Sequence, residues 1–113
     1  MGPPVSDPER RFADLAEHFA GEEGVELPRE GGPRRFGSDA LTVHGSIFAM
    51  LTRGELVVKL PAARVAELVA SGNGLPFMAG KGRSMREWVV VAVDDPLQWH
   101  ELAREALGFV RGR

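Results

Sequence analysis

Side chains that could act as nucleophiles are few in this chain of 113 residues, because it contains no cysteine. None of the serines lies in a G-x-S-x-G or an S-x-x-K motif, which would place the hydroxyl beside an activating group. The hydroxyl residues weighed for this role are Ser6, Ser38, Ser46, Ser71, Ser84, Thr42 and Thr52. The sequence therefore predicts no catalytic residue and favours a non-enzymatic protein.

The three histidines, His18, His44 and His100, offer weak support for a metal site. His18 and Glu22 are four residues apart and could share one helix face, but a catalytic zinc needs three protein ligands. His44 precedes Gly45 in an expected hairpin turn, where histidine tolerates unusual backbone angles. His100 follows shortly after Asp95, which a helix start would use for capping. We therefore predict no metal site and no cofactor.

Two groups of basic residues could bind an anion or a nucleic acid if the fold brought them together. The five residues are Arg34, Arg35, Lys81, Arg83 and Arg86. The glycine-rich stretch around Lys81 does not have P-loop spacing, and it precedes an expected strand instead of opening a helix. Solvated loop residues are the simpler interpretation of the same charges, so nucleic-acid binding is an alternative and not the favoured function.

The overall composition is that of an ordinary globular domain, with 43% hydrophobic and 27% charged residues and a net charge of −2. This charge balance points to neither a nucleic acid nor an anionic membrane as the partner. No apolar run approaches the length of about 20 residues that spans a bilayer, and the first residues lack the pattern of a secretory signal. We expect one domain over residues 1–113 of a cytoplasmic, bacterial protein, with no membrane contact.

Three helices have clear boundary signals. They are expected to begin at Asp7-Pro8, at Pro61 and at Asp95-Pro96, and the first two to end at Gly21 and Ser71-Gly72. Apolar residues recur at helical spacing in the first and last of these segments, which predicts one buried stripe on each. The residues of these stripes are Phe12, Leu15, Ala16, Phe19, Trp99, Leu102, Ala103, Ala106 and Val110.

The strands are expected between these helices, joined by short turns that favour antiparallel pairing. Residues 41–43, 46–51, 55–60 and 88–93 have strand character, and 76–79 could add a short edge strand. The unbroken apolar run after Trp88 predicts a strand covered on both faces, with Trp88 and Trp99 buried between the last strand and the last helix. Residues 1–6 are expected to be flexible, and 21–35 to form a loop. The predicted fold class is α+β, with an antiparallel sheet of four to five strands and helices at the N-terminus, in the middle and at the C-terminus.

Several short motifs in the last two-thirds of the chain are similar to one family. They are Phe36-Gly37, His44-Gly45-Ser46-Ile47-Phe48-Ala49, Gly54-Glu55-Leu56-Val57-Val58-Lys59, Pro76-Phe77, Gly80-Lys81-Gly82-Arg83-Ser84-Met85 and Trp88-Val89-Val90-Val91. In their order and spacing the chain resembles the TfoX N-terminal-like family, which is related in style to the small MmcQ/YjbR-type domains. The resemblance implies an α+β fold with flanking helices and brings no established catalytic set. Some longer members regulate natural competence together with a transcription activator.

These observations favour a small protein-interaction or regulatory module that presents a sheet edge or face to a protein partner, or to another copy of itself. Two alternatives stay open at this point. One is a nucleic-acid-binding domain that uses the basic residues above. The other is a small-molecule-binding domain with a pocket near Phe48, Phe77 and Trp88.

Overall fold

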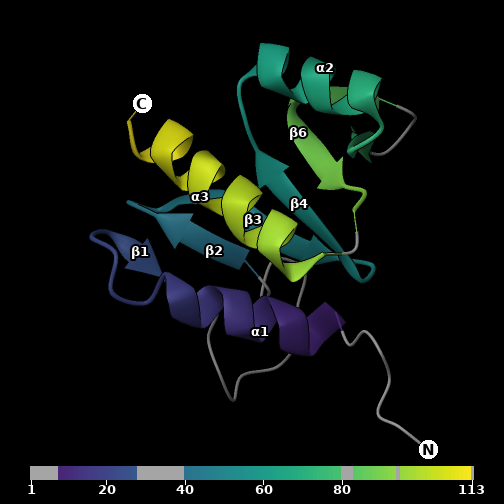
Figure 1. The fold of residues 1–113 in the computed structure, drawn as a ribbon. Coiled ribbons are helices and arrows are strands. Elements are labelled where there is room, and N and C mark those ends of the chain that lie inside the picture. Colours follow the sequence, from purple (N-terminus) through teal and green to yellow (C-terminus); the bar gives the residue numbers. More distant parts are fainter. Residues whose placement is uncertain (1–7, 28–39, 80–82, 94, 113) are drawn as a thin grey trace, which may run out of the picture.

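The computed structural model describes residues 8–27, 40–79, 83–93 and 95–112. It shows an α+β fold in which three helices accompany one antiparallel sheet of six strands (Figure 1). The elements in chain order are α1 (Pro8–His18), β1 (Val25–Glu26), β2 (Ala40–Val43), β3 (Ser46–Thr52), β4 (Glu55–Lys59), α2 (Ala62–Ser71), β5 (Gly74–Ala79), β6 (Arg83–Val91) and α3 (Pro96–Arg111). The predicted fold class and the positions of the three helices are confirmed.

The strands lie in the order β1-β2-β3-β4-β6-β5, and every neighbouring pair is antiparallel. Tight turns at His44-Gly45 and Arg53-Gly54 join β2 to β3 and β3 to β4, and all four residues have positive φ angles. Glycine adopts this conformation freely, and histidine is among the residues enriched in it. The expected hairpins are therefore confirmed, including the turn at His44.

The predicted number of strands was too low, because β1 lies inside the stretch expected to be a loop. Val25 pairs with Val43 of β2 and packs against the core, although glycines and acidic residues surround it. Two residues are too short a run to show the alternation that identifies a strand in a sequence. The edge position expected for residues 76–79 is confirmed by β5, which tolerates Pro76 at the edge of the sheet.

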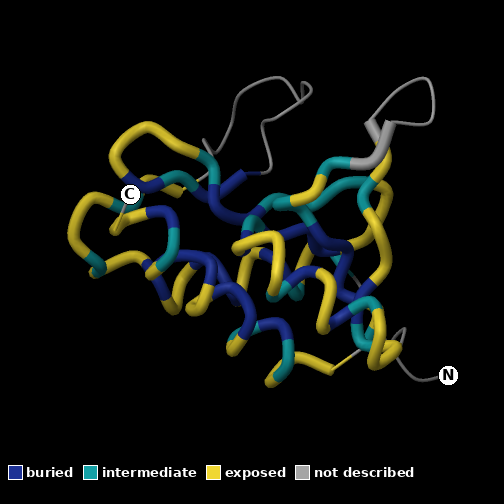
Figure 2. Tube along the Cα trace, turned by 90° about the horizontal axis from the view of Figure 1, so that it is seen from above, coloured by how far each residue is buried: buried dark blue, intermediate teal, exposed yellow. Residues whose placement is uncertain are grey.

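All three helices contribute to one core on the same face of the sheet, which we call the inner face. Helix α3 packs on the middle strands, α2 packs on β5 and β6, and α1 contacts β3 and α3. The apolar stripes expected for the first and last helices are buried, and Trp99 is only 4% exposed. Figure 2 shows the buried stretches gathered where the helices meet the sheet. On the sheet, the residues of this core include Leu41, Val43, Phe48, Ala49, Leu56, Val58, Leu60, Val89 and Val91.

The helix boundaries follow from local chemistry. The side chain of Asp95 accepts a hydrogen bond from the backbone N–H of Leu97, which caps the start of α3. Helix α2 ends at Gly72, which adopts a left-handed conformation and donates its N–H to the last turn. The next strand begins two residues later at Gly74, where a side chain would collide with Val89. This close approach brings α2 directly onto the edge of the sheet.

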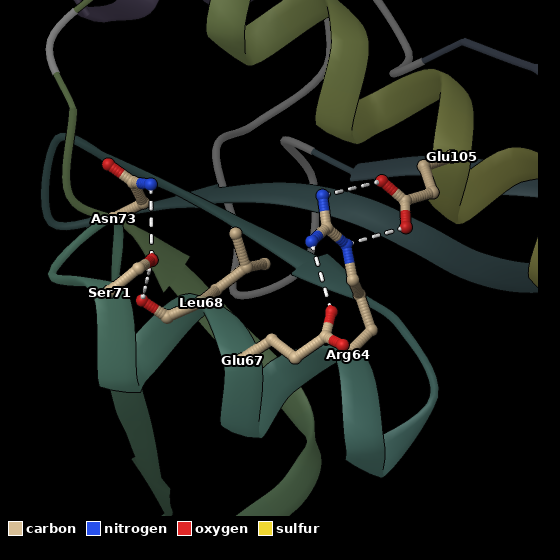
Figure 3. A network of polar contacts seen from close by, with 6 residues as sticks. All are labelled: Arg64, Glu67, Leu68, Ser71, Asn73 and Glu105. Atoms are coloured by element: carbon tan, nitrogen blue, oxygen red, sulfur yellow. Dashed lines mark hydrogen bonds and ion pairs between the residues drawn. The ribbon is translucent and has the colours of Figure 1, made fainter.

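Helices α2 and α3 are also joined by polar contacts (Figure 3). The Arg64 guanidinium donates through Nε to Oε2 of Glu105 at 2.8 Å and through Nη2 to Oε1 at 3.3 Å. A third contact of the same guanidinium reaches Glu67 on its own helix. The hydrogen bond to Glu105 raises the pKa of Arg64 above its ordinary value. Arg64 therefore stays charged and links the two helices.

Two predictions concern segments that the structure does not describe. The expected flexibility of residues 1–6 and the expected loop at 28–35 lie outside the described residues. Within the described ranges, none of the helices combines the length and the apolar character required to cross a membrane.

Candidate functional site

The basic residues predicted to bind an anion are largely outside the described part of the chain. Three of them, Arg34, Arg35 and Lys81, lie outside the described residues. The structure describes only the backbone of Arg83, at the start of β6. Arg86 is exposed on β6. The described residues therefore do not test whether the five residues form one surface, and nucleic-acid binding stays a prediction of the sequence.

The sheet face opposite the helices, which we call the outer face, carries an ordered set of apolar residues. The strand registers pair Leu75 with Val90, Val90 with Val57, Val57 with Met50 and Met50 with Ala40. Directly paired residues of neighbouring antiparallel strands lie on the same face of the sheet. These five residues therefore form one continuous row across five strands, which we call the apolar row.

Two observations place this row on the outer face. Successive residues of a strand point to opposite faces, and Leu56, Val58, Val89 and Val91, which flank the row on β4 and β6, all belong to the inner core. At the sheet edge, a side chain on Gly74 would meet Leu68 of α2, so its neighbour Leu75 points away from the helices. Among the described residues, no helix packs over this row.

The apolar row is partly accessible. Val57 is fully buried, Val90 and Ala40 are each 7% exposed, Met50 is half-buried, and Leu75 is 50% exposed. Leu75 is thus one of the most exposed large apolar side chains of the described residues, and it lies at one end of the row. An apolar side chain that remains half in water is the part of this row available to another molecule.

Opposite charges flank the row along β4. On one side, Lys59 pairs with Trp88, its Nζ lying 5.1 Å from the centre of the indole ring and 3.8 Å from Oε1 of Glu87. On the other side, Glu55 is exposed and pairs with Thr52. Because Glu55, Val57 and Lys59 are alternate residues of one strand, an acid, an apolar residue and a base follow one another on the outer face.

The position of Trp88 differs from the one expected from the sequence. Trp88 was expected to be buried between the last strand and the last helix, but it is half-buried on the outer face and stacks against Lys59. Its place beside an apolar run suggested a core residue. The face of the sheet on which Trp88 lies, however, is determined by the register between β4 and β6. Trp99, in contrast, belongs to the core as expected.

The three residues suggested for a small-molecule pocket do not line one pocket. Phe48 is fully buried on the inner face, where its ring contacts that of Phe19 at a centroid distance of 5.9 Å. Trp88 lies on the opposite face, and Phe77 is half-buried on β5 at the edge. The sheet itself separates Phe48 from Trp88, so these two aromatic side chains cannot line one cavity.

The second group of chemically capable residues lies where α1 meets α3. The His18 and His100 rings are in edge contact at a centroid distance of 4.8 Å, and His100 also lies 5.5 Å from the Phe19 ring. Burial lowers the pKa of His100, and the nearby His18 and Arg104 lower it further, while Glu101 opposes them. Glu22, the residue considered together with His18 as a ligand pair, accepts from Arg104 at 3.2 Å and lies 3.5 Å from Arg111. Throughout the described residues, no group of three or more potential ligands could hold a metal ion.

The apolar row is the feature that sequence reasoning missed. The alternation along β4 was readable, since Glu55, Val57 and Lys59 were separated from Leu56, Val58 and Leu60 by their spacing alone. The row also depends on β6 lying between β4 and β5, which is a long-range pairing. Only that strand order joins Val57 to Val90 and Leu75.

Comparison with known proteins gives no match: no family model, no curated protein and no solved structure is similar enough to this chain to be matched.

Proposed function

We propose that this chain is a non-enzymatic protein-interaction module that binds its partner on the outer face of the sheet. The observation that carries the proposal is the apolar row, which runs across five strands on the face that no helix of the described residues covers. A regulatory role, as the resemblance to the TfoX N-terminal-like family implies, is part of the same proposal.

The chemistry of this face specifies the partner. The accessible apolar groups of this face are Leu75, at one end of the row, and the half-buried Met50, while Lys59 and Glu55 offer opposite charges on the two sides of the row. Protein interfaces combine an apolar centre with a polar rim, and complementary charges set the orientation of the two partners. The partner is therefore a protein surface with an apolar group that contacts Leu75, a carboxylate near Lys59 and a base near Glu55.

Trp88 and Lys59 give this surface a rigid border. Stacking on the indole restricts the Lys59 side chain, and Glu87, the residue before Trp88 on β6, approaches its ammonium group. A charged group that is held in place loses less side-chain entropy on binding than a free lysine. Aromatic residues are also enriched in protein interfaces compared with the rest of the protein surface.

Site-specific photo-cross-linking in cells tests the proposal. A photoreactive amino acid replaces Leu75 on the outer face, and in the control it replaces Leu97, which is 64% exposed at the start of α3. We expect a discrete protein adduct from position 75, its loss when Lys59→Glu is added, and no such adduct from position 97. Equal labelling from both positions, or only internal cross-links from position 75, would contradict the proposal.

A further inference from the structure

We infer that α1 is a pH-sensitive element of the fold, which separates from α3 more readily when His18 and His100 are protonated. The inference goes beyond the proposed function, because it concerns the inner face of the sheet and does not depend on the outer face. Its geometric basis is the contact between the two imidazole rings, one from each helix, whose centroids are 4.8 Å apart. Two neutral imidazoles pack at this distance, whereas two imidazolium ions repel each other.

Helix α1 is held on the rest of the fold by its side chains. The backbone hydrogen bonds of a helix lie within the helix, whereas a strand is also bonded to its neighbours. The buried side chains of α1 are Phe12, Leu15 and Ala16, and the fully buried Phe19 follows directly after it. An element with this kind of attachment can open locally while the remainder stays folded. The apolar packing is the same at every pH, so acid acts on the open population through the two histidines.

The chain that follows α1 is attached to α3 by a separate set of contacts. Glu22 accepts a hydrogen bond from Arg104 at 3.2 Å and lies 3.5 Å from Arg111. Gly21 stands between α1 and this attachment, and a Cβ atom there would meet nothing within 4 Å. The bend that moves α1 away from α3 therefore falls near Gly21, while Glu22 stays on α3.

Separation of the helices changes the surroundings of His100. Burial is the largest cause that lowers the pKa of His100, the positive charges of His18 and Arg104 lower it further, and Glu101 raises it. Arg104 and Glu101 belong to α3 and remain beside His100 when α1 leaves. His18 and part of the burial are lost, so His100 accepts a proton more readily in the open state. By linkage, protonation then favours the open state.

The strands packed against α3 add no charge at this place. β2 and β3 contain no titratable side chain, and the charged residues of β4, Glu55 and Lys59, lie on the outer face. On α1 itself, Asp14 lies four residues before His18 and Glu17 directly before it. Both acids move together with α1, so they accompany His18 in the closed and the open state. The pH dependence of the separation therefore comes from the two imidazoles.

Thiol labelling at buried positions tests whether α1 opens on its own. Because the chain has no cysteine, Ala16→Cys on α1 and Ala49→Cys on β3 each carry a single thiol, and both alanines are buried. The rate of reaction with a maleimide, divided by the rate of a short cysteine peptide at the same pH, measures how often each position opens. We expect position 16 to react faster than position 49. Its rate should also depend less on urea, because local opening exposes less surface than global unfolding.

The pH dependence of this labelling tests the role of the histidines. From pH 7.5 to 5.5, the relative rate at position 16 should increase at least about threefold. The combined change His18→Gln and His100→Gln should remove most of this increase. The control His44→Asn, at an exposed histidine of the β2–β3 turn, should retain it. Circular dichroism confirms that each variant is folded, and an increase that persists without the two histidines would overturn their role.

Hydrogen exchange on the unchanged chain supplies a readout without any substitution. An isolated helix of 11 residues is not stable in water, so the amides of α1 exchange when it separates. After correction for the intrinsic exchange rate, their protection should decrease on acidification by a factor similar to that of the labelling. Equal protection of positions 16 and 49, with the same steep urea dependence, would mean that α1 opens only when the whole chain unfolds, and the inference would be wrong.

Discussion

The ring of His18, at the last residue of α1, lies edge-on against the ring of His100 in the second turn of α3, with a centroid distance of 4.8 Å. Phe19 follows directly, is fully buried and lies 5.5 Å from His100. Arg104 lies over the Phe19 ring, with its guanidinium carbon 5.1 Å from the centre of that ring. Burial of His100 and the nearby His18 and Arg104 lower its pKa and so disfavour its protonation, while Glu101 acts in the opposite direction.

The stability of the fold should decrease in mild acid because of His100. Its pKa in the folded chain is lowered by burial, by His18 and by Arg104, so the unfolded chain binds the proton more readily. The contribution of His100 is present in full above its ordinary pKa of 6.5 and is lost progressively as the pH falls from that value through the lowered pKa of the folded chain. We expect the melting temperature to fall between pH 7.5 and 5.5 by less in His100→Gln than in the unchanged chain.

His44 provides the control for this measurement. It is exposed in the turn between β2 and β3, and asparagine tolerates its positive φ angle. His44→Asn should therefore keep the pH dependence of the unchanged chain, because the environment of His100 stays intact. If His100→Gln and the unchanged chain lost the same stability in acid, the assignment to His100 would be wrong.

Gly74 should not tolerate a side chain, because α2 packs directly onto the sheet at this residue. A Cβ atom there would lie 2.6 Å from Cγ2 of Val89 and 3.1 Å from Cβ of Leu68, and both residues are buried. Overpacking of a filled core costs about 1–3 kcal/mol, so Gly74→Ala should lower the free energy of unfolding by that amount. Urea denaturation measures it, and Val89→Ala should cost less in the Gly74→Ala variant than in the unchanged chain, because the new Cβ atom occupies part of the space that the valine leaves.

Gly108 is the matched control, since it lies in α3 and a Cβ atom there meets nothing within 4 Å. Alanine is the better helix former, so Gly108→Ala should raise the free energy of unfolding by about 0.5–1 kcal/mol. The two identical substitutions are thus expected to have opposite signs. A loss of stability at Gly108 as large as at Gly74 would argue against the steric explanation.

Much of this fold could be predicted from local signals. The apolar stripe of α1, the Asp95 cap of α3 and the His44-Gly45 turn each depend on residues close in sequence, and each is confirmed. β1 could not be identified, because it has two residues and is stabilised by its pairing with β2. The site could not be predicted either, since the apolar row joins β4 to β6 and β5, and the face of Trp88 follows from the same register.

The ion pair between Arg64 and Glu105 should contribute modestly to stability. Their side chains are 37% and 40% exposed, so water and salt screen the attraction despite the short Nε to Oε2 distance of 2.8 Å. A double-mutant cycle with Arg64→Ala and Glu105→Ala should give a coupling of about 0.3–1 kcal/mol. The same cycle with Arg64 and Glu67, on one helix, should give a smaller value. A coupling that did not decrease in 1 M salt would indicate a contact other than this ion pair.

Substitutions of Phe48 on the inner face and Trp88 on the outer face should lower the free energy of unfolding by different amounts. Phe48 is fully buried in the inner core, so Phe48→Ala should lower the free energy of unfolding by about 3–5 kcal/mol at any protein concentration. Trp88 is half-buried and stacks against Lys59 on the outer face, so Trp88→Ala should cost only about 1–2 kcal/mol in dilute protein. Urea denaturation of the two variants and the unchanged chain measures both costs. Equal costs at both positions would mean that Trp88 belongs to the core after all.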